Sequence, residues 1–586
     1  MTFFADPAAF PTPPDGLFLG ADPKKLRSTG VPLERHALTI AGAGSGKGAC
    51  LLIPNARRWR DNLLAVDPKG ENAEATWQAR EALGQSVHVL DPFQAANVPD
   101  RLRGAFNPLA SIRVDSPTGR EDCEVVADGL VKRSDPKHEE WYDGAGALLS
   151  GIIAYVVETA PPEHRTLAAV RGVLVQSDEA LAEDAERMQQ CTAFGGLARE
   201  AGLTITVALG SAKGMEKDFL SSARRFTRWL DSPQIAATLA RSTFNLADLK
   251  QGRASVYLVL PPKYLDTHAA FLRLFVRSAI EAMMTDGLNN GSRCLFLLDE
   301  FFSLGRLDIV AKSAGLMRAY RLHLWPFLQD IGQLRSLYGD AADTFFANAD
   351  AAVFFGNADL PTLEYVSRKI GAVDPREIGE APTMGSGINP ITGATVGAMF
   401  GQSRNQHTRV AGALIGGAVG AVGAALNDLQ TRAQQAEMNE YQQKAMKVGR
   451  ARLAPEEVQA LTGKAQGATV APGMLAFLRA GEVLHLRPVA YFDERLRKFT
   501  DLSERLQSRK AEAKVKPPAP RMAGALDLVA GLIGFLLLGS VAGPLSQPAT
   551  VPAETWPALY AMWGGGAAII AALVLWRRKI MKAHKG

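Results

Sequence analysis

Short apolar runs alternate with helical segments along the first part of the chain. Residues 36–40, 62–66 and 86–90 have strand length and apolar character, and glycines follow the first of them. Strands separated by helical segments are typical of a parallel sheet, because a parallel crossover needs a dozen or more residues. Similar runs return further along the chain, at residues 255–260, 294–298, 323–327 and 352–355. The pattern therefore predicts an α/β domain.

Residues 114–240 interrupt this alternation. Apolar positions there follow the helical period, as in residues 121–131, 144–159 and 167–175, and β-branched runs are few. Since strand patterns stand on both sides of this region, we predict an all-α unit inserted into the α/β domain.

Glycine dominates the next region. Residues 385–401 are a glycine-rich loop, and the apolar stretch 410–426 places Gly412, Gly416 and Gly420 four residues apart. Small residues at this spacing allow close helix packing in membranes, but a helix packed on the protein itself gives the same pattern. Both interpretations stay open. A further α/β-like piece follows at residues 453–491, and then a charged helical linker at 493–516.

The last part of the chain carries two apolar segments, residues 523–543 and 557–576. Each has about 20 residues, the length that crosses ~30 Å of hydrocarbon. Basic residues flank both outer ends: Lys514, Lys516, Arg521, Arg577, Arg578, Lys579 and Lys582. This predicts a transmembrane hairpin with both ends in the cytoplasm and an inner-membrane location. A buried helical hairpin of a soluble domain is the alternative. The first 20 residues show no signal-peptide pattern.

The composition excludes few classes of protein. The length of 586 residues predicts two or three compact units, and a net charge of +5 neither demands nor excludes a nucleic-acid partner. The four cysteines are scattered, without the spacing of a metal site, and we expect buried cytosolic thiols.

The most informative motif follows the first strand. Residues 41–48 read Ala-Gly-Ala-Gly-Ser-Gly-Lys-Gly. Gly44, Ser45 and Gly46 can present backbone N–H groups to phosphates, and Lys47 can reach the β- and γ-phosphates of a nucleotide. Two positions depart from the usual motif, because Ala41 replaces the first glycine and Gly48 replaces the hydroxyl that binds Mg²⁺. A flexible glycine turn is the alternative interpretation.

A second motif supports the first. The apolar strand at residues 294–298 ends in Asp299 and Glu300. Asp299 fits the role of holding Mg²⁺, and Glu300 fits the role of polarising the attacking water. A third strand delivers Gln329, which can sense the γ-phosphate, to the same edge of the sheet. We therefore predict an ATP site with Lys47, Glu300 and Gln329 as catalytic residues and residues 44–48 with Asp299 as the binding set.

Residues 67–71, Asp-Pro-Lys-Gly-Glu, follow the second strand and should lie at the same edge. Asp67 and Lys69 can support the nucleotide or couple it to a neighbouring subunit. A turn with solvated charges explains them equally well.

Together these motifs resemble the coupling-protein ATPases of type IV secretion and conjugation, the TraG/TraD-like family. The likeness covers roughly residues 30–500 and rests on residues 45–48, 52–55, 67–71, 106–109, Trp141, 298–301, 304–305, Gln329, 333–334, 338–339 and 450–458. Glycine commonly follows the loop lysine in that family, as Gly48 does here.

The resemblance implies a RecA-like P-loop NTPase domain with an inserted all-α domain, assembled as a hexamer around a passage. It implies an ATP-driven coupling protein that recruits relaxase-bound single-stranded DNA and pumps it into a type IV secretion channel. Two alternatives remain: a receptor of the same fold for effector proteins only, and a chromosomal DNA pump. The C-terminal position of the predicted anchor departs from the family, whose membrane helices usually come first.

These inferences divide the chain into seven parts. The nucleotide-binding domain comprises residues 1–113, 241–384 and 446–505, with the all-α insert at 114–240 and a glycine-rich insert at 385–445. A linker at 506–522 leads to the membrane hairpin at 523–576. The sequence does not identify the arginine that contacts ATP from a neighbouring subunit, although Arg318, Arg335 and Arg368 are candidates.

Overall fold

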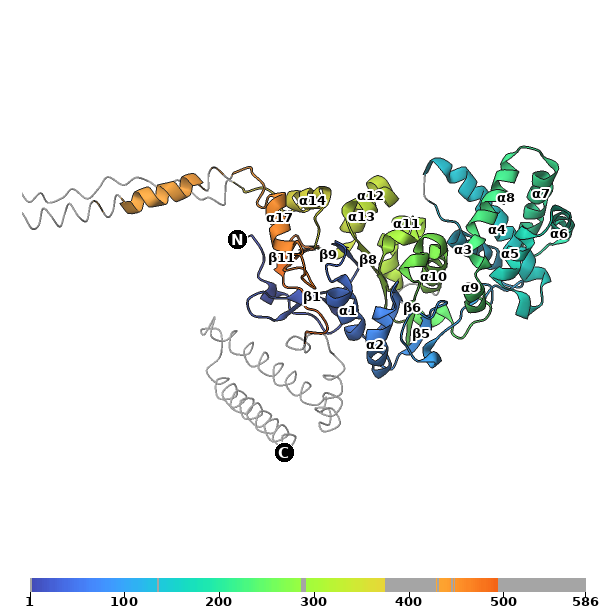
Figure 1. Ribbon diagram of the computed structural model, residues 1–586, viewed down its shortest axis with the longest axis horizontal. Coiled ribbons are helices and arrows are strands. Elements are labelled where there is room, and N and C mark those ends of the chain that lie inside the picture. Colours follow the sequence, from blue (N-terminus) through green and yellow to red (C-terminus); the bar gives the residue numbers. More distant parts are fainter. Residues whose placement is uncertain are drawn as a thin grey trace, which may run out of the picture. The chain divides into compact units, whose positions relative to one another are not determined.

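Figure 1 shows the computed structural model of the chain, which describes residues 3–133, 136–285, 291–374, 428, 432–443, 446 and 448–493. The chain divides into two compact units, Met1–Ser503 and Glu504–Gly586, and every described residue belongs to the first. In this part of the chain, no helix is long and apolar enough to cross a lipid bilayer. The predicted hairpin at 523–576 and the glycine-spaced stretch at 410–426 lie outside the described residues.

The main sheet has nine strands within the described residues, in the order β11-β10-β9-β3-β8-β7-β4-β6-β5. Its strands are β3 (His36–Ala41), β4 (Asn62–Val66), β5 (Ser86–Leu90), β6 (Ala254–Leu258), β7 (Cys294–Leu298), β8 (Leu322–Leu328), β9 (Ala349–Phe355), β10 (Met474–Leu478) and β11 (Val483–Leu486). Strands β3 to β9 pair in parallel, whereas β10 and β11 are antiparallel. This arrangement confirms the predicted α/β class and fits a RecA-like NTPase fold.

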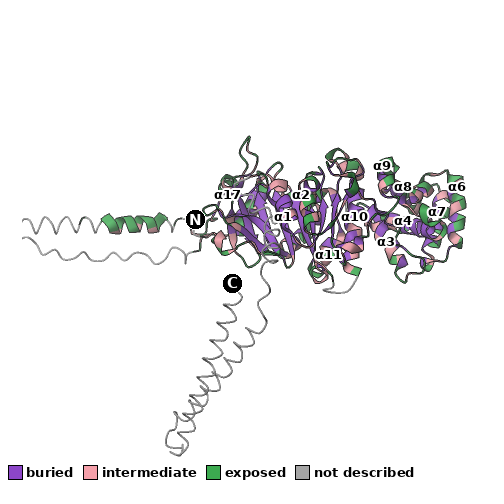
Figure 2. Cartoon of the chain, turned by 90° about the horizontal axis from the view of Figure 1, so that it is seen from below, coloured by how far each residue is buried: buried purple, intermediate pink, exposed green. Residues whose placement is uncertain are grey.

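The sheet is buried on both faces, because alternate side chains of each strand belong to two different cores. On β3, Leu38 and Ile40 face one core and Ala37 and Ala41 the other. The first face is covered by α10 (Leu265–Thr285), α11 (Asp308–Met317), α12 (Ile331–Tyr338), α13 (Ala342–Ala347), α14 (Leu360–Ile370) and α17 (Pro455–Thr462). The second is covered by α1 (Ile53–Arg58) and α2 (Glu71–Ala82). Figure 2 shows the buried residues running through this interior.

A two-stranded antiparallel sheet, β1 (Gly16–Ala21) and β2 (Ser28–Pro32), packs beside α1. Asn55 on α1 fixes this contact, since its side chain accepts a hydrogen bond from the N–H of Phe18 and donates one to the carbonyl of Phe18, both at 2.8 Å. The sequence did not predict this hairpin.

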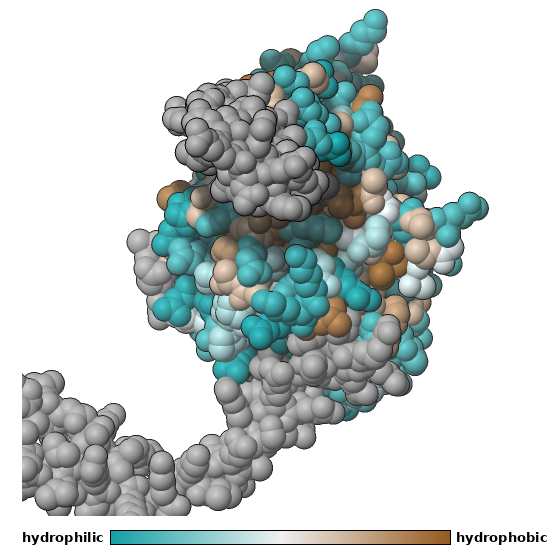
Figure 3. Space-filling model, turned by 90° about the vertical axis from the view of Figure 1, so that its left-hand side faces the viewer, coloured by the Kyte–Doolittle hydropathy of each residue, from teal (hydrophilic) through white to brown (hydrophobic). Residues whose placement is uncertain are grey.

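Figure 3 views the molecule from the left of Figure 1. Hydrophilic side chains dominate this face, and hydrophobic ones gather in a recess.

The helical insert connects β5 to β6, which pair directly with each other. Its helices are α3 (Gly119–Leu130), α4 (Glu139–Thr159), α5 (Leu167–Val175), α6 (Asp178–Gln190), α7 (Leu197–Gly210), α8 (Met215–Phe226) and α9 (Pro233–Thr238). The insert is therefore one long crossover between neighbouring strands, and Figure 1 shows it as a separate group of helices beyond β5 and β6. The predicted boundaries at 114 and 240 fall just before α3 and just after α9.

Candidate functional site

The loop after β3 has the backbone of a phosphate cradle. Gly44 and Gly46 adopt left-handed conformations, with φ of 66° and 100°. A side chain at Gly46 would also meet Val470, because a Cβ atom there would come within 2.9 Å of its methyl group. Both glycines are therefore required by the turn. The chain enters a helical turn, Gly48–Leu52, directly after Lys47, so the loop ends at a helix N-terminus that favours anions.

A segment far along the chain holds this loop from outside. The ammonium group of Lys464 donates a hydrogen bond to the carbonyl of Gly44 at 2.6 Å, and the N–H of Ala471 donates to the carbonyl of Ser45 at 3.1 Å. These bonds hold the carbonyl side of the loop in place. Neither residue was predicted from the sequence, because neither lies in a phosphate-binding motif and 420 positions separate Lys464 from Gly44.

The space beside the loop fits a nucleotide phosphate chain. A Cβ atom at Gly48 would meet no atom within 4 Å, so the space beside this backbone is open. The hydroxyl of Ser45 is buried and has no hydrogen-bond partner among the described residues. It lies against the backbone of Gly356, where a Cβ atom would come within 3.2 Å of it, so Ser45 offers its backbone to the loop and not its hydroxyl. The loop residues therefore fit the cofactor that the sequence predicts.

Parallel register brings two acids together at the same sheet edge. Val66 of β4 pairs with Leu298 of β7, so Asp67 and Asp299 follow side by side. Burial raises the pKa of Asp67 to about 7, opposed by a hydrogen bond from the N–H of Ala73. Burial likewise raises the pKa of Asp299 to about 6, while the positive charge of Lys47 lowers it. The negative charges of these two carboxyls are not fully compensated within the chain. A divalent cation would compensate both, so the pair fits a cation site.

The three predicted catalytic residues meet at this edge. The ammonium nitrogen of Lys47 lies 3.9 Å from Oε1 of Glu300, and the amide of Gln329 donates to Oε2 of Glu300 at 3.4 Å. Glu300 itself has a left-handed backbone with φ of 50°, which is uncommon for a residue with a side chain. The strained turn directs its carboxylate toward Lys47. The structure thus groups Lys47, Asp299, Glu300 and Gln329 around the loop.

A buried arginine supports the segment after Glu300. Arg273 on α10 is almost fully enclosed and donates to the carbonyls of Leu304 and Arg306 at 3.0 and 2.7 Å. The ring of Tyr338 stacks on Phe301, and its hydroxyl accepts a hydrogen bond from Leu307. These contacts hold the acidic turn in place from the helical side of the sheet.

The candidate arginines lie elsewhere. Arg335 and Arg368 both line a cavity of about 660 Å³ beside Tyr365 and Phe477. Arg318 lies after the end of α11. No contact between these three side chains and Lys47, Asp299 or Glu300 is found in the described part of this chain. That one of them contacts the ATP of a neighbouring subunit stays a prediction.

The sequence matches the family described as type IV secretory system conjugative DNA transfer over residues 14–376. It is 29% identical over 345 residues to a probable conjugal transfer protein TraG of Sinorhizobium fredii (strain NBRC 101917 / NGR234), with 57% of this chain and 52% of that protein covered. It is 28% identical over 352 residues to the protein VirD4 of Agrobacterium fabrum (strain C58 / ATCC 33970), with 58% and 50% covered. The chain spans about half the length of the curated relatives it matches.

Among solved structures, the plasmid coupling protein TrwB in complex with a non-hydrolysable GTP analogue is similar with a TM-score of 0.45. The sequence identity is 18%, and the match covers 58% of this chain and 76% of that one.

Proposed function

The chain belongs to the family of type IV secretory system conjugative DNA transfer proteins, and from this premise we propose that it is an ATP-driven coupling protein. It recruits relaxase-bound single-stranded DNA and pumps it into a type IV secretion channel. The family resemblance found in the sequence motifs is confirmed by this match. The observation that carries the proposal is the convergence of Lys47, Glu300 and Gln329 at one edge of a parallel sheet.

We assign the chemistry of ATP hydrolysis to these residues. Lys47 and the amides of residues 44–48 bind the phosphates, and the Lys47 charge balances the charge that develops on the γ-phosphate. Glu300 accepts a proton from the attacking water, and Gln329, hydrogen-bonded to Glu300 at 3.4 Å, orients that carboxylate and reports the state of the γ-phosphate. Asp299, with Asp67 beside it, would hold Mg²⁺, which supplies charge neutralisation at the phosphates.

The helical insert recognises cargo in this proposal. It carries none of the phosphate-site residues, yet it connects two neighbouring strands of the sheet whose edge holds them. Asn107 fixes its base, because the side chain donates to the carbonyl of Arg165 at 2.8 Å and accepts from the N–H of Leu109 at 3.0 Å.

Assembly and location complete the proposal. The family resemblance supports a homo-hexamer that works with the components of a secretion channel. The two apolar segments at 523–543 and 557–576, with basic flanks on both outer sides, support an anchor in the bacterial inner membrane with the ATPase in the cytoplasm.

The test is the ATP hydrolysis rate of the full chain in lipid nanodiscs, measured with and without single-stranded DNA. We expect single-stranded DNA to raise the rate, and we expect no hydrolysis from Lys47→Ala under either condition. A rate that responds to a protein cargo but not to DNA identifies the receptor for effector proteins. A rate that responds only to double-stranded DNA identifies a chromosomal DNA pump.

A further inference from the structure

The connection after α3 lies against the segment that follows the acidic turn. Arg133 and Arg306 pair through their backbones as an antiparallel bridge. Next to it, a Cβ atom at Gly305 would come within 3.3 Å of the side chain of Lys132, so the two stretches are in close contact. Lys132 and Arg133 belong to the helical insert, whereas Gly305 and Arg306 belong to the nucleotide-binding part. The insert therefore touches the segment that begins with Glu300.

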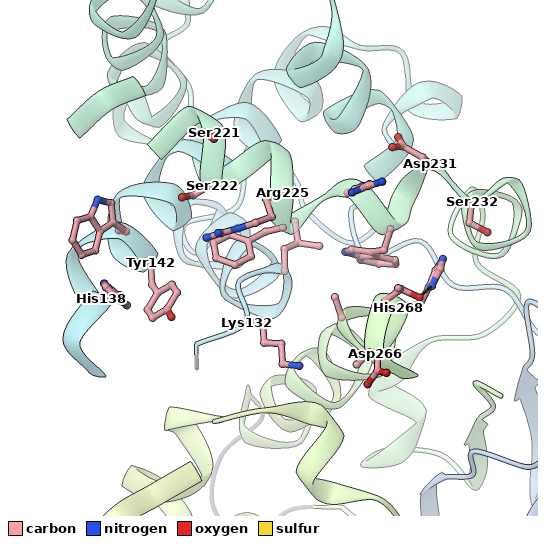
Figure 4. A pocket seen from close by; sticks show the side chains of 18 of the residues that line it. Lys132, His138, Tyr142, Ser221, Ser222, Arg225, Asp231, Ser232, Asp266 and His268 are labelled. Carbon is pink, nitrogen blue, oxygen red and sulfur yellow. Dashed lines mark hydrogen bonds between the residues drawn. The ribbon is translucent and has the colours of Figure 1, made fainter. Parts of the chain in front are cut away.

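A cavity of about 1350 Å³ adjoins this contact. Lys132 lines it from the insert, together with Trp229, and Asp266 lines it from the first turn of α10. Figure 4 shows Lys132 and Asp266 in the lower part of its wall. The two parts of the chain are thus separated by open space on this side, and the contact through Lys132 and Arg133 lies at its border.

Arg133 forms ion pairs with acids of both parts. Its guanidinium donates to Glu139 at 2.6 Å and lies 2.8 Å from Asp143, and both acids belong to α4. Its Nε atom lies 3.8 Å from a carboxylate oxygen of Asp308, the first residue of α11. The side chains of Arg133 and Asp308 are only 15% and 22% exposed. Charges that are mostly covered are screened less than surface charges, so this pair helps to fix the start of α11.

Two further ion pairs cross the same boundary. Arg306, which follows the acidic turn, lies 3.3 Å from Glu139 of the insert and also donates to Asp308 at 2.6 Å. Arg277 on α10 donates to Asp128 on α3 at 3.0 Å. Each of the three pairs joins an arginine of one part to an acid of the other. Of these three arginines, only Arg133 comes from the insert.

The acidic turn depends on such support, because its backbone is strained. Glu300 has a φ of 50°, a conformation that is costly for a residue with a side chain and persists only where the surroundings impose it. The N–H of Ser303 donates to the carbonyl of Glu300 at 2.8 Å, and Arg273 binds the carbonyls of Leu304 and Arg306. The turn is therefore held at its start by β7 and at its end by Arg273 and the insert.

We propose that Arg133 is a positioning residue for ATP hydrolysis. Through Asp308 and the backbone of Arg306, it holds the acidic turn so that the carboxylate of Glu300 faces the attacking water. This inference rests on the proposed function, because it names the contact outside the phosphate site that keeps Glu300 in place. Arg133 makes no ion pair with the phosphate loop in the described part of the chain, so its loss slows hydrolysis and leaves nucleotide binding intact.

The experiment measures kcat for ATP hydrolysis and the Kd of a fluorescent ATP analogue, both with the full chain in nanodiscs. Arg133→Gln and Asp308→Asn each remove one partner of the pair. We expect kcat to fall about tenfold or more in both, because a small misplacement of a catalytic group can cost ~10²-fold, while Kd changes by less than about twofold. Arg133→Lys keeps the charge and should retain most of the wild-type rate.

Arg187→Gln on α6 is the matched control. Arg187 also pairs with two acids, Glu183 and Asp184, but both lie on its own helix within the insert. This variant should hydrolyse ATP at the wild-type rate. If Arg133→Gln does not fold, Asp308→Asn decides, because asparagine retains the size of the aspartate side chain.

Two combined variants separate positioning from general damage to the site. The double variant of Arg133→Gln with Asp308→Asn should lose no more rate than the single variants, because the two residues act as one unit. When Arg133→Gln is added to Glu300→Gln, we expect no further loss of rate, since Arg133 acts through Glu300.

The proposal is overturned if Arg133→Gln and Asp308→Asn hydrolyse ATP at the wild-type rate, if Kd rises as much as kcat falls, or if Arg133→Gln slows the Glu300→Gln variant further. A near-normal rate in Glu300→Gln alone would contradict the proposed function. A slow Glu300→Gln with a normal Arg133→Gln would contradict only the role of Arg133, so the two failures are distinguishable.

Discussion

The ammonium nitrogen of Lys47 lies 3.9 Å from a carboxylate oxygen of Glu300, and both side chains are largely or partly shielded from solvent. Lys47 ends the loop after β3, whereas Glu300 follows β7, and β8 separates the two strands in the sheet. Without nucleotide, the two charges compensate each other. The γ-phosphate of ATP would take the place of the carboxylate as the partner of Lys47 and leave Glu300 free to act on water.

Lys47→Ala should therefore abolish nucleotide binding. The phosphates lose the lysine that ends the loop, and Glu300 loses the cation nearest to it. We expect at least a hundredfold rise in the Kd of a fluorescent ATP analogue, measured by titration of the full chain. Lys464→Ala should have a smaller effect of a few-fold, because Lys464 holds the loop carbonyl of Gly44 and not the phosphates. Equal losses in the two variants would contradict the assignment.

Gly48 and Gly46 should respond differently to the same substitution. A side chain at Gly48 meets no atom within 4 Å, so Gly48→Ser should fold normally and retain ATP binding. The added hydroxyl also stands where most P-loops bind Mg²⁺. We therefore expect nucleotide binding to depend more strongly on Mg²⁺ than in the wild type. Gly46→Ser must adopt a φ of 100° and displace Val470, so it should lose binding. Titration of both variants with the ATP analogue checks the contrast.

The stability of the nucleotide-free protein should fall as the pH rises toward neutrality. Burial raises the pKa of Asp67 from 3.8 to about 7, so the folded chain keeps a proton that the unfolded chain has already lost. The stabilising contribution is complete below pH 3.8 and is lost as the pH passes about 7. Between about pH 5 and pH 8 the ionisation of Asp67 should lower the free energy of unfolding by roughly 2–3 kcal/mol, since each pKa unit is about 1.4 kcal/mol.

Asp67→Asn removes this titration and should flatten the dependence of Tm on pH, measured by differential scanning calorimetry in EDTA. The amide oxygen can still accept the hydrogen bond from Ala73. Asp340→Asn, at an exposed position, is the control and should retain the wild-type slope. An unchanged slope in Asp67→Asn would show that Asp67 is ionised in the folded protein. Asp299, with a pKa raised to about 6, should contribute a similar slope over a narrower range.

The predicted membrane hairpin can be tested by cysteine labelling. A thiol probe that does not cross the membrane should reach a cysteine at position 547 from the periplasmic side and miss one at position 585. A chain that ends after Lys516 should leave the membrane fraction and keep its ATP site. Labelling at 585 with protection at 547 would mean that the orientation is inverted. A truncated chain that still sediments with membranes would point to a second contact, with residues 410–426 as the first candidate.

The strands were predictable because they are buried on both faces. Residues 62–66, 86–90 and 294–298 were placed correctly: the first and last are almost entirely apolar, and the second carries the β-branched residues Val87 and Val89 that favour a strand. The meeting of Lys47, Asp299 and Gln329 followed from parallel topology alone, because motifs at the carboxyl ends of such strands share one edge. The local sequence pattern and the overall fold agree here, so the position of the site could be predicted from the sequence.

Other parts were not predictable from local pattern. The hairpin of β1 and β2 contains Gly16, Gly20 and Gly30, and its stability depends on packing against α1 and on Asn55. The support of the loop by Lys464 depends on a contact over 420 positions, which has no local signal. The cavity around Trp229 is likewise assembled from three separate stretches of chain. Such features depend on tertiary contacts between distant residues, which periodicity does not report.

The most direct measurement compares ATP binding with ATP hydrolysis in Glu300→Gln. We predict that this variant binds ATP with near wild-type affinity, because Lys47 and the loop amides remain. Its hydrolysis rate should fall about 10²–10⁴-fold, the usual effect of removing a positioned base. Glu364→Gln, on α14, is the control and should hydrolyse ATP at the wild-type rate. Hydrolysis by Glu300→Gln at a near-normal rate would contradict the central claim that this carboxylate, beside Lys47 and Gln329, activates the attacking water.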